Sequence, residues 1–278
     1  MLVEVEHLKI AFKFEKRLSV PVRDVSLKIA EGERVALVGE SGCGKSLTAL
    51  ALGELVDRAI ISGKIKRNAK IAYIFQNPMQ SLNPVMKVGR QIDEAAPFTG
   101  IAMRLLDAVG LPITTVNKYP SELSGGQQQR VMIAMALAQS PDLLIADEPT
   151  TALDVTTQKE VLDLIDKIAR ERKMAVLLIT HNLGLVAQYS DFVNVMYAGE
   201  IVERGAVKDV LSNARHPYTQ GLIAAVPRLD LPKDSPLAEI PGTVPAPWAW
   251  PSGCAFHPRC PKAMEECKKK VLETCVCK

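Results

Sequence analysis

The chain has 278 residues, of which 47% are hydrophobic and 23% are charged, and its formal net charge is +3. A chain of this size can bury a full hydrophobic core, as one large domain or as one domain with appendages. Residues 254–278 contain six Lys or Arg residues and three Glu residues, so residues 1–253 are neutral. A neutral body argues against a large nucleic-acid-binding face.

The sequence contains no apolar run of the roughly 18–20 residues that a membrane-spanning helix requires. The first residues, MLVEVEHLKI, alternate apolar and acidic side chains and lack the basic start and apolar stretch of a signal peptide. We therefore expect a soluble, intracellular protein. A function at a membrane would require a partner that supplies the membrane-spanning part.

The order of the predicted elements indicates an α/β fold. VEVEHLKIAF and VPVRDVSLKI alternate with period two and are predicted to be antiparallel strands. The buried strands ERVALVG, AKIAYIF, DLLIADE and MAVLLITH alternate with the helical stretches RQIDEAA, MRLLDAVG and QKEVLDLIDKIARER. This alternation predicts a parallel sheet. FVNVMYAGEIVERG is predicted to be a hairpin with its turn at Ala198-Gly199.

The composition changes after Val226. Pro227 and six further prolines up to Pro251 lie close together, which predicts an extended linker over residues 227–253. Five of the six cysteines follow it, in residues 254–278. We therefore predict a main domain over residues 1–226, a linker and a cysteine-rich tail.

The stretch GESGCGKS matches the phosphate-loop pattern G-x-x-x-x-G-K-[ST], with a strand before it and a predicted helix from about Lys45. Successive backbone N–H groups would wrap the phosphates of a nucleotide. Lys45 would neutralise the β- and γ-phosphates, and Ser46 would bind Mg²⁺. The alternative is a glycine turn with an exposed lysine. The predicted nucleotide-binding residues here are Gly39, Glu40, Ser41, Gly42, Cys43, Gly44, Lys45, Ser46 and Leu47, of which Cys43 is expected to be chemically silent.

A second nucleotide element is predicted in DLLIADEPTTALD, residues 142–154. Asp147, at the end of an apolar strand, would hold the Mg²⁺ shell, and Glu148 would polarise the attacking water as general base. Two acids at a strand end can also form a solvated terminus, but the phosphate loop in the same chain favours the nucleotide function.

Residues 123–130 read LSGGQQQR, and a Ser-Gly-Gly stretch that opens a helix is another anion-binding helix start. One nucleotide rarely needs two such phosphate-binding sites within one protein, here the phosphate loop and this helix start. A dimer does use both, because the second site of each subunit closes on the ATP held by the other.

With these motifs the sequence resembles the ABC-transporter ATPases over nearly its whole length. In the family's order, the chain has a Q-loop glutamine in IFQNP, the LSGGQ signature, a D-loop at Ala152-Leu153-Asp154 and a switch histidine in LLITHN. The resemblance implies a P-loop NTPase core with an antiparallel β subdomain and a helical signature subdomain at about 78–140. A C-terminal cysteine-rich appendage would follow.

The resemblance also implies a role for each matching residue. Gln76 would contact Mg²⁺ and the lytic water, His181 the γ-phosphate, and Asp154 would couple two ATP sites. The signature residues that would close on the ATP of the other subunit are Ser124, Gly125, Gly126 and Gln127. Phe12 is expected to stack on adenine, with Phe14 as the rival. The alternatives are a plain loop glutamine, a structural histidine and a core aromatic.

Longer stretches resemble the oligopeptide/dipeptide/nickel importer ATPases in particular. They are HPYTQGLIAAVP, IPGTVPAPWAWPSGC, CAFHPRCP, IVERG and RVMIAMALAQSPDLLIADEPTTALDVTTQ. The chain departs from that family in one place. The stretch between Gln76 and Leu123, residues 77–122, is shorter than expected for a peptide importer. This helical region docks on the permease, so the departure leaves the permease and the solute open, with nickel chelates and oligosaccharides as alternatives to peptides.

The cysteine spacing of the tail is C-x5-C-x6-C-x7-C-x-C. Zinc sites and ferredoxins have tighter spacings, and disulfides are not expected in a reducing cytosol. The spacing by itself leaves zinc, an iron–sulfur cluster and free thiols equally open. The resemblance implies a [4Fe–4S] cluster held by Cys254, Cys260, Cys267 and Cys277, with Cys275 as the alternative fourth ligand.

The resemblance therefore implies an ATP-hydrolysing importer subunit for di- or oligopeptides or a related solute. Expected partners are two integral-membrane permease subunits, a second ATPase subunit in a heterodimer or homodimer, and an extracellular solute-binding protein, with no nucleic acid. The protein would lie at the cytoplasmic face of the membrane. The alternative is a soluble ABC ATPase that acts on ribosomes or nucleic acid without a permease. A kinase with the same phosphate loop would leave LSGGQ unexplained.

Overall fold

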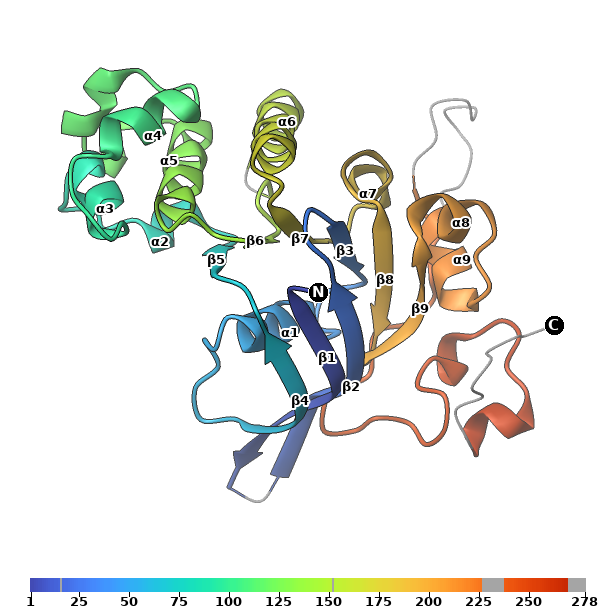
Figure 1. The fold of residues 1–278 in the computed structure, drawn as a ribbon. Helices are drawn as coiled ribbons and strands as arrows, with labels where there is room; N and C mark the ends of the chain where they lie inside the picture. Colours follow the sequence, from blue (N-terminus) through green and yellow to red (C-terminus); the bar gives the residue numbers. More distant parts are fainter. Residues whose placement is uncertain (16, 152, 227–237, 270–278) are drawn as a thin grey trace. The chain divides into compact units, whose positions relative to one another are not determined.

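The computed structural model describes residues 1–15, 17–151, 153–226 and 238–269 (Figure 1). The chain forms two compact units. Unit 1 contains Met1–Leu2, Ile29–Glu33 and Asn68–Leu178, and unit 2 contains Val3–Lys28, Arg34–Arg67 and Ile179–Lys278. Each unit has a hydrophobic core of its own.

The antiparallel strands of unit 2 are β1 (Val3–Phe14), β2 (Arg17–Ile29) and β4 (Ile60–Arg67). β1 pairs antiparallel with β4, and the register shifts between Glu6 and Lys9. His7 lies in this bulge with φ 52°. One extra residue in a bulge moves the following side chains to the opposite face. The buried positions accordingly change from Val3 and Val5 to Leu8 and Ile10.

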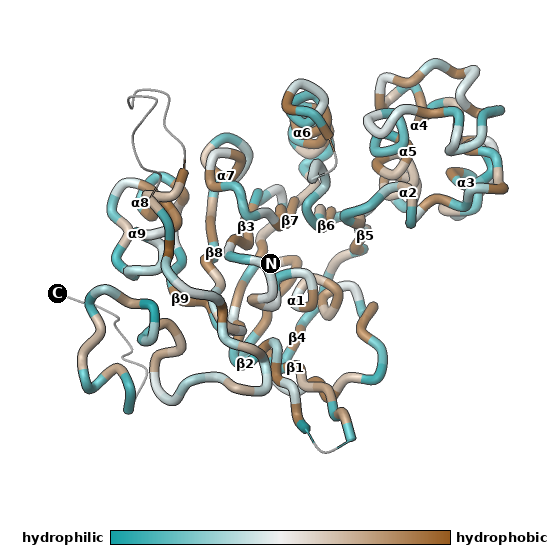
Figure 2. The backbone as a smooth tube through the Cα atoms, turned by 180° about the vertical axis from the view of Figure 1, so that it is seen from behind, coloured by the Kyte–Doolittle hydropathy of each residue, from teal (hydrophilic) through white to brown (hydrophobic). Residues whose placement is uncertain are grey.

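The remaining strands of unit 2 are β3 (Arg34–Val38), β8 (Phe192–Tyr197) and β9 (Glu200–Ala206), in the order β4-β1-β2-β9-β8-β3. β3 is parallel to β8, and β8 and β9 are antiparallel. The predicted hairpin is confirmed: Ala198 and Gly199 both have positive φ, as a tight two-residue turn requires. β3 and β8 are almost entirely buried, and most of β8 is coloured as hydrophobic in Figure 2.

Helices and the C-terminal segment complete unit 2. They are α1 (Lys45–Leu52), α7 (Leu183–Tyr189), α8 (Val207–Ser212), α9 (Pro217–Ala224) and the 3-10 turns η3 (His257–Arg259) and η4 (Glu265–Lys268). Phe256, just before η3, is 2% exposed and contacts Tyr197 and Tyr218 with ring centroids 5.1 and 5.4 Å away. The described part of the C-terminal segment therefore packs on the core of this unit.

Unit 1 contains the strands β5 (Ile71–Ile74) and β6 (Leu143–Asp147) and all but the last two residues of β7 (Ala175–Thr180). They lie in the order β7-β6-β5, with β5 and β6 parallel. Its helices are α2 (Pro78–Ser81), α3 (Val88–Glu94), α4 (Ala102–Ala108), α5 (Gly125–Ala138), α6 (Val155–Arg172) and the turns η1 (Ile113–Asn117) and η2 (Pro120–Glu122). Residues 78–140 thus contain only helices and loops, with α3 and α4 beside α5 in Figure 1.

The predicted α/β core is confirmed in both units. Every predicted buried strand is present, and helices are present at the predicted stretches RQIDEAA, MRLLDAVG and QKEVLDLIDKIARER. Strand β4 is not predicted by the sequence pattern, because IISGKIKR has a glycine and three basic residues and most of its side chains are exposed. Gly63 within it lies opposite the bulge, where an added Cβ would be 2.3 Å from the His7 carbonyl oxygen.

Candidate functional site

The predicted phosphate loop connects β3 to α1 in unit 2. The side chain of Lys45 turns back into the loop, where Nζ donates hydrogen bonds to the carbonyl oxygens of Gly39 (2.7 Å) and Glu40 (3.0 Å). Lys45 is only 6% exposed. The ammonium is therefore held inside the loop and is not a mobile surface charge, which excludes the alternative of an exposed lysine at a glycine turn.

Two glycines make this loop possible. Gly39 has φ 153°, and an added Cβ would lie 2.1 Å from the Met196 carbonyl oxygen. Gly44 has φ 102° and precedes α1 as its N-cap, where a Cβ would lie 2.6 Å from the Pro21 carbonyl oxygen. Because Gly44 has no side chain, no side-chain cap covers the start of α1. The first N–H groups of a helix have no partner within the helix and attract anions.

Cys43 is part of the phosphate loop, and its side chain is fully buried. Burial raises the pKa of its thiol. The thiolate is the reactive form of cysteine, so a raised pKa keeps Cys43 unreactive at neutral pH. This agrees with the expectation that the residue is chemically silent.

The two predicted carboxylates lie at the end of β6 in unit 1. Asp147 is 6% exposed and accepts a hydrogen bond of 2.8 Å from the Tyr73 hydroxyl. Glu148 follows with φ 44°, a left-handed conformation that is uncommon for residues other than glycine. Its Oε2 accepts hydrogen bonds from Gln76 Nε2 (3.2 Å) and Thr151 Oγ1 (2.8 Å). Two predicted catalytic residues, Gln76 and Glu148, are therefore in direct contact.

Tyr73 and Thr151 did not emerge from the sequence. Tyr73 occupies a half-buried position of β5, where an aromatic residue is an ordinary strand residue. Burial, together with the charge of Asp147, raises the pKa of its hydroxyl, so the hydroxyl stays protonated and donates. The sequence indicates a role for Thr151 only through its position three residues after Glu148. At that separation a side chain can contact the earlier residue across a turn.

The predicted signature residues open helix α5. Ser124 is the N-cap: its Oγ accepts from the Gln127 N–H at 3.3 Å, and Gln127 Oε1 accepts from the Ser124 N–H at 3.1 Å. This reciprocal capping box explains why serine and glutamine flank the two glycines. An added Cβ on Gly126 would lie 2.5 Å from Thr157 Cγ2 in α6, whereas on Gly125 the nearest atom would be 3.4 Å away.

Asp154 caps helix α6, where Oδ1 accepts from the N–H groups of Thr156 (3.1 Å) and Thr157 (3.0 Å). The hydrogen bond from the Thr157 N–H is the main cause that lowers the pKa of Asp154. Ala152, also part of the predicted D-loop, lies outside the described residues. Asp154 therefore has a structural role as a helix cap, which the D-loop pattern does not predict.

The other predicted contacts to nucleotide lie in unit 2. His181 is exposed and follows the end of β7, next to Asn182, which caps α7 by accepting from the Gly184 N–H at 2.9 Å. Phe12 and Phe14 lie near the end of β1 with ring centroids 6.4 Å apart, and Phe14 is 62% exposed. Both predicted adenine-stacking candidates therefore lie side by side at the same end of β1.

The cysteine tail is described up to residue 269. The Cys254 N–H donates to the Cys267 carbonyl oxygen at 2.8 Å, and Cys260 follows η3. Cys275 and Cys277 lie outside the described residues. Within the described ranges no three His, Cys, Asp or Glu side chains form a group that could hold a metal ion. The predicted iron–sulfur site therefore gains no support from this part of the chain.

Across the described ranges, no helix combines the length and hydrophobicity of a membrane span. The family described as ABC transporter matches residues 22–151, and that described as oligopeptide/dipeptide transporter, C-terminal region, matches residues 202–267. The oligopeptide transport ATP-binding protein AppD of Bacillus subtilis is 44% identical over 298 residues, or 96% of this chain and 90% of that protein. The chain belongs to the ABC transporter family of ATP-binding proteins.

Other relatives agree with this assignment. A peptide import ATP-binding protein of Brucella abortus is 44% identical over 311 residues, or 97% of this chain and 92% of that protein. The ATP-binding cassette MJ0796, in a dimeric post-hydrolysis structure with ADP and Pi, has a TM-score of 0.66 and 26% identity. That match covers 74% of this chain and 99% of that one. The predicted ABC ATPase fold and the resemblance to the peptide-importer group are confirmed, and the protein is an ABC-type ATPase.

The close approach of α5 and α6 generates a prediction about Gly126. Replacing Gly126 with Ala should destabilise the protein by about 1–3 kcal/mol, because the new methyl group overpacks against Thr157 Cγ2. The measurement is chemical denaturation followed by circular dichroism. The matched control is Gly125→Ala, whose Cβ meets only an ordinary contact and which should leave stability unchanged or slightly raised.

A double variant tests the cause of that loss. Thr157→Ser removes Cγ2, the atom that the new methyl group would meet. In the Thr157→Ser background, Gly126→Ala should therefore lower the free energy of unfolding much less than it does in the wild type. A loss of the same size in both backgrounds would contradict the packing explanation.

Proposed function

We propose that this ATPase is the ATP-hydrolysing subunit of an importer for di- or oligopeptides or a related solute. The observation that carries the proposal is the match of residues 202–267 to the oligopeptide/dipeptide transporter C-terminal region. The relatives that align over nearly the whole chain are named for peptide import or oligopeptide transport. Two integral-membrane permease subunits would form the pathway for the solute, and the ATPase would lie on the cytoplasmic face of the membrane.

The proposed binding of ATP uses the phosphate loop. Backbone N–H groups of the loop and of the first turn of α1 would hold the phosphates, and Lys45 would balance their charge. Ser46 and Asp147 carry the hydroxyl and carboxylate oxygens that suit Mg²⁺, and a bound Mg²⁺ offsets charge on the phosphates during cleavage. Phe12, with Phe14 as the alternative, would stack on adenine.

The proposed chemistry is attack of water on the γ-phosphate. Glu148 would orient the water and accept its proton, and its carboxylate is held for this task by Gln76 and Thr151. His181 would contact the γ-phosphate. These two hydrogen bonds restrict the rotamers of Glu148, so that less order has to be imposed when the nucleotide binds.

Assembly is also part of the proposal. In a dimer, Ser124, Gly125, Gly126 and Gln127 would face the ATP of the other subunit, and Asp154 would couple the two sites. Ser124 and Gln127 cap α5, and Asp154 caps α6. These capping hydrogen bonds would hold the three side chains in position before a partner binds. The second subunit would be a related chain or a second copy, and an extracellular solute-binding protein would deliver the solute.

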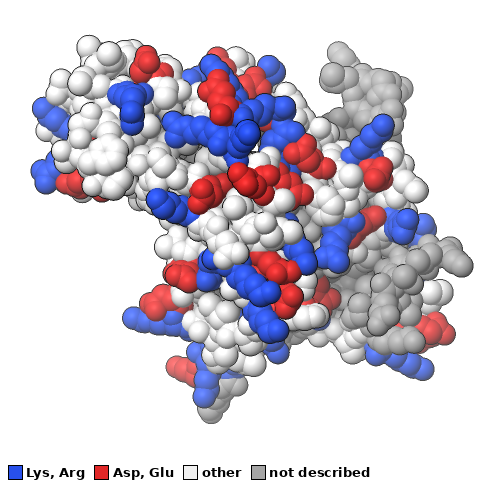
Figure 3. All heavy atoms as spheres, viewed as in Figure 1, with Lys and Arg blue, Asp and Glu red and all other residues white. Residues whose placement is uncertain are grey.

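The alternative of a soluble ABC ATPase that acts on ribosomes or nucleic acid is not favoured. The relatives that align over nearly the whole chain are named for peptide import or oligopeptide transport. Basic and acidic side chains are interspersed on the face shown in Figure 3. On α6, for example, Lys159 pairs with Asp163 and Arg170 with Asp166. Nucleic-acid binding favours a continuous basic surface instead.

Partner capture tests the transport proposal. An affinity-tagged form of the full chain, expressed at its natural level and purified from detergent-solubilised cells, should bring down integral-membrane proteins. Its ATPase activity should change when these are reconstituted in vesicles with peptide. Recovery of ribosomes without membrane proteins would contradict the importer assignment and favour the soluble alternative.

The role of Glu148 gives a second prediction. Glu148→Gln should lower turnover by about 100-fold or more, because the amide cannot accept the proton, while ATP binding is kept. Steady-state ATPase rates and fluorescent-nucleotide titration measure the two effects. Glu94→Gln, which breaks only an exposed pair with Arg90 on α3, is the control and should match wild type. Turnover near wild type in Glu148→Gln would refute the assignment of the base.

The [4Fe–4S] cluster remains a proposal for the tail. Its ligands would be Cys254, Cys260, Cys267 and Cys277, with Cys275 as the alternative to Cys277. The hydrogen bond between the backbones of Cys254 and Cys267 supports the proximity of two of them. The described residues do not make the site by themselves, so no step of ATP hydrolysis is assigned to a cluster.

Elemental analysis of anaerobically purified protein tests this proposal. Iron and acid-labile sulfide should each approach about four per chain, with a visible absorption band. The combined substitution of Cys254, Cys260 and Cys267 by Ser should abolish both, whereas Cys43→Ser, in the phosphate loop, should not. One zinc without sulfide, or no metal, would refute the cluster.

A further inference from the structure

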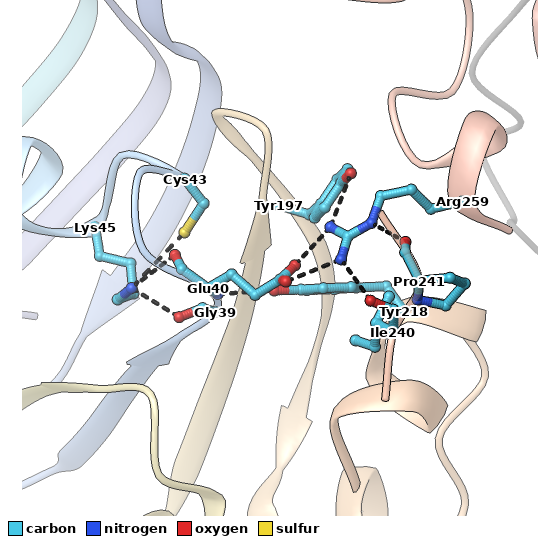
Figure 4. Close-up of polar contacts among 9 residues, drawn as sticks. All are labelled: Gly39, Glu40, Cys43, Lys45, Tyr197, Tyr218, Ile240, Pro241 and Arg259. Carbon is cyan, nitrogen blue, oxygen red and sulfur yellow. Dashed lines mark hydrogen bonds and ion pairs between the residues drawn. The ribbon is translucent and has the colours of Figure 1, made fainter. Parts of the chain in front are cut away.

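The C-terminal segment, residues 238–269, contacts the phosphate loop through one arginine. Arg259 Nη1 donates to Glu40 Oε2 at 2.8 Å, and Nη2 donates to Glu40 Oε1 at 2.9 Å (Figure 4). The Arg259 side chain is 5% exposed and that of Glu40 is 30% exposed. Two parallel hydrogen bonds between a guanidinium and a carboxylate form the strongest kind of ion pair that side chains make.

The guanidinium is itself fixed by the segment that carries it. Nε donates to the Pro241 carbonyl oxygen at 2.8 Å, and Nη2 also donates to the Ile240 carbonyl oxygen at 3.2 Å. Nη1 lies 3.4 Å from the Tyr197 hydroxyl. Arg259 therefore cannot swing away from Glu40 without losing several hydrogen bonds in a nearly dry environment.

The backbone of Glu40 is held by a second residue of the C-terminal third. The Glu40 N–H donates to the Tyr218 hydroxyl at 2.8 Å. Tyr218 is fully buried and packs against Tyr197, with ring centroids 4.6 Å apart. The Glu40 carbonyl oxygen in turn accepts from Lys45 Nζ. Glu40 thus connects the C-terminal segment to the lysine of the phosphate loop.

A glutamate in a loop that receives an anion is electrostatically unfavourable. Its carboxylate repels the phosphates unless a cation neutralises it, and the repulsion is strong where water is partly excluded. Arg259 supplies that cation and turns the carboxylate towards the C-terminal segment (Figure 4).

We propose that Arg259 is a positioning residue for ATP: it neutralises Glu40 and holds it in the orientation that places Lys45. The C-terminal segment then sets the affinity of the phosphate loop for nucleotide. This inference rests on the proposed binding of ATP at the loop. Arg259 itself touches neither the nucleotide nor the reacting atoms.

A double-mutant cycle on the full chain tests the proposal. Arg259→Gln should raise the Kd and KM for Mg²⁺-ATP by on the order of tenfold, with kcat at saturating ATP largely kept, because Glu40 is left as an unpaired negative charge. Glu40→Gln removes that charge. The double variant Arg259→Gln with Glu40→Gln should therefore bind ATP more tightly than Arg259→Gln alone.

The rescue separates positioning from plain structural support. If Arg259 acts only by holding Pro241 and Ile240, removing the Glu40 charge cannot restore ATP affinity, and an unrescued loss would overturn the proposal. Arg259→Lys keeps the charge without the paired geometry and should lie between wild type and Arg259→Gln. If Arg259→Gln does not fold, the comparison of ATP affinity is made with Arg259→Lys.

Arg34→Gln is the matched control, because it breaks another arginine–carboxylate pair, with Asp191, at the opposite end of β3 from the phosphate loop. It should lower the melting temperature and leave the Kd for ATP unchanged. An Arg259→Gln protein with wild-type ATP affinity would overturn the inference and leave the proposed function intact. Failure of the wild-type protein to bind ATP would instead overturn the assignment of the loop, and the inference with it.

Discussion

The buried ammonium of Lys45 is the constraint on which the phosphate loop depends. A buried charge is stable only where hydrogen bonds replace its lost water. The carbonyl oxygens of Gly39 and Glu40 provide these bonds. Gly39 can direct its carbonyl inwards because it has no Cβ to collide with Met196. Glu40 can do so while its N–H and carboxylate are held by Tyr218 and Arg259. The shape of the loop is therefore set partly by residues about 200 positions away.

The carboxylate site in unit 1 follows a comparable principle. Asp147 and Glu148 are adjacent in sequence but have different environments: Asp147 is buried and accepts from a half-buried hydroxyl, whereas Glu148 is half-buried and accepts from an exposed amide and an exposed hydroxyl. The left-handed backbone of Glu148 directs its side chain towards Gln76, and such conformations persist only where surrounding contacts determine them. Different environments for two neighbouring acids are what the proposed division into metal ligand and base would require.

The C-terminal segment shows how a short, proline-rich stretch can be ordered without a core of its own. The prolines by themselves predict an extended linker, and the resemblance implies a tail held by an iron–sulfur cluster. The described residues of this segment pack on the core of unit 2: Phe256 contacts both Tyr197 and Tyr218, and Trp250 Nε1 donates to the Val20 carbonyl oxygen. A large buried aromatic ring contributes several kcal/mol, about 3–5 by truncation, which helps to offset the entropy of ordering such a segment.

The sequence by itself determined the strands other than β4, the longer helices, and the motifs of the phosphate loop, the acidic pair and the signature, because each depends on contiguous residues whose backbone chemistry is local. It also determined the family, since these motifs occur in a fixed order. Only the tertiary structure decided the pairings: Gln76 with Glu148, Tyr73 with Asp147, Gly126 against Thr157 and Arg259 with Glu40. Hydrophobic periodicity tells which face of an element is buried, but not which distant side chain that face meets, and that choice is made when the elements pack.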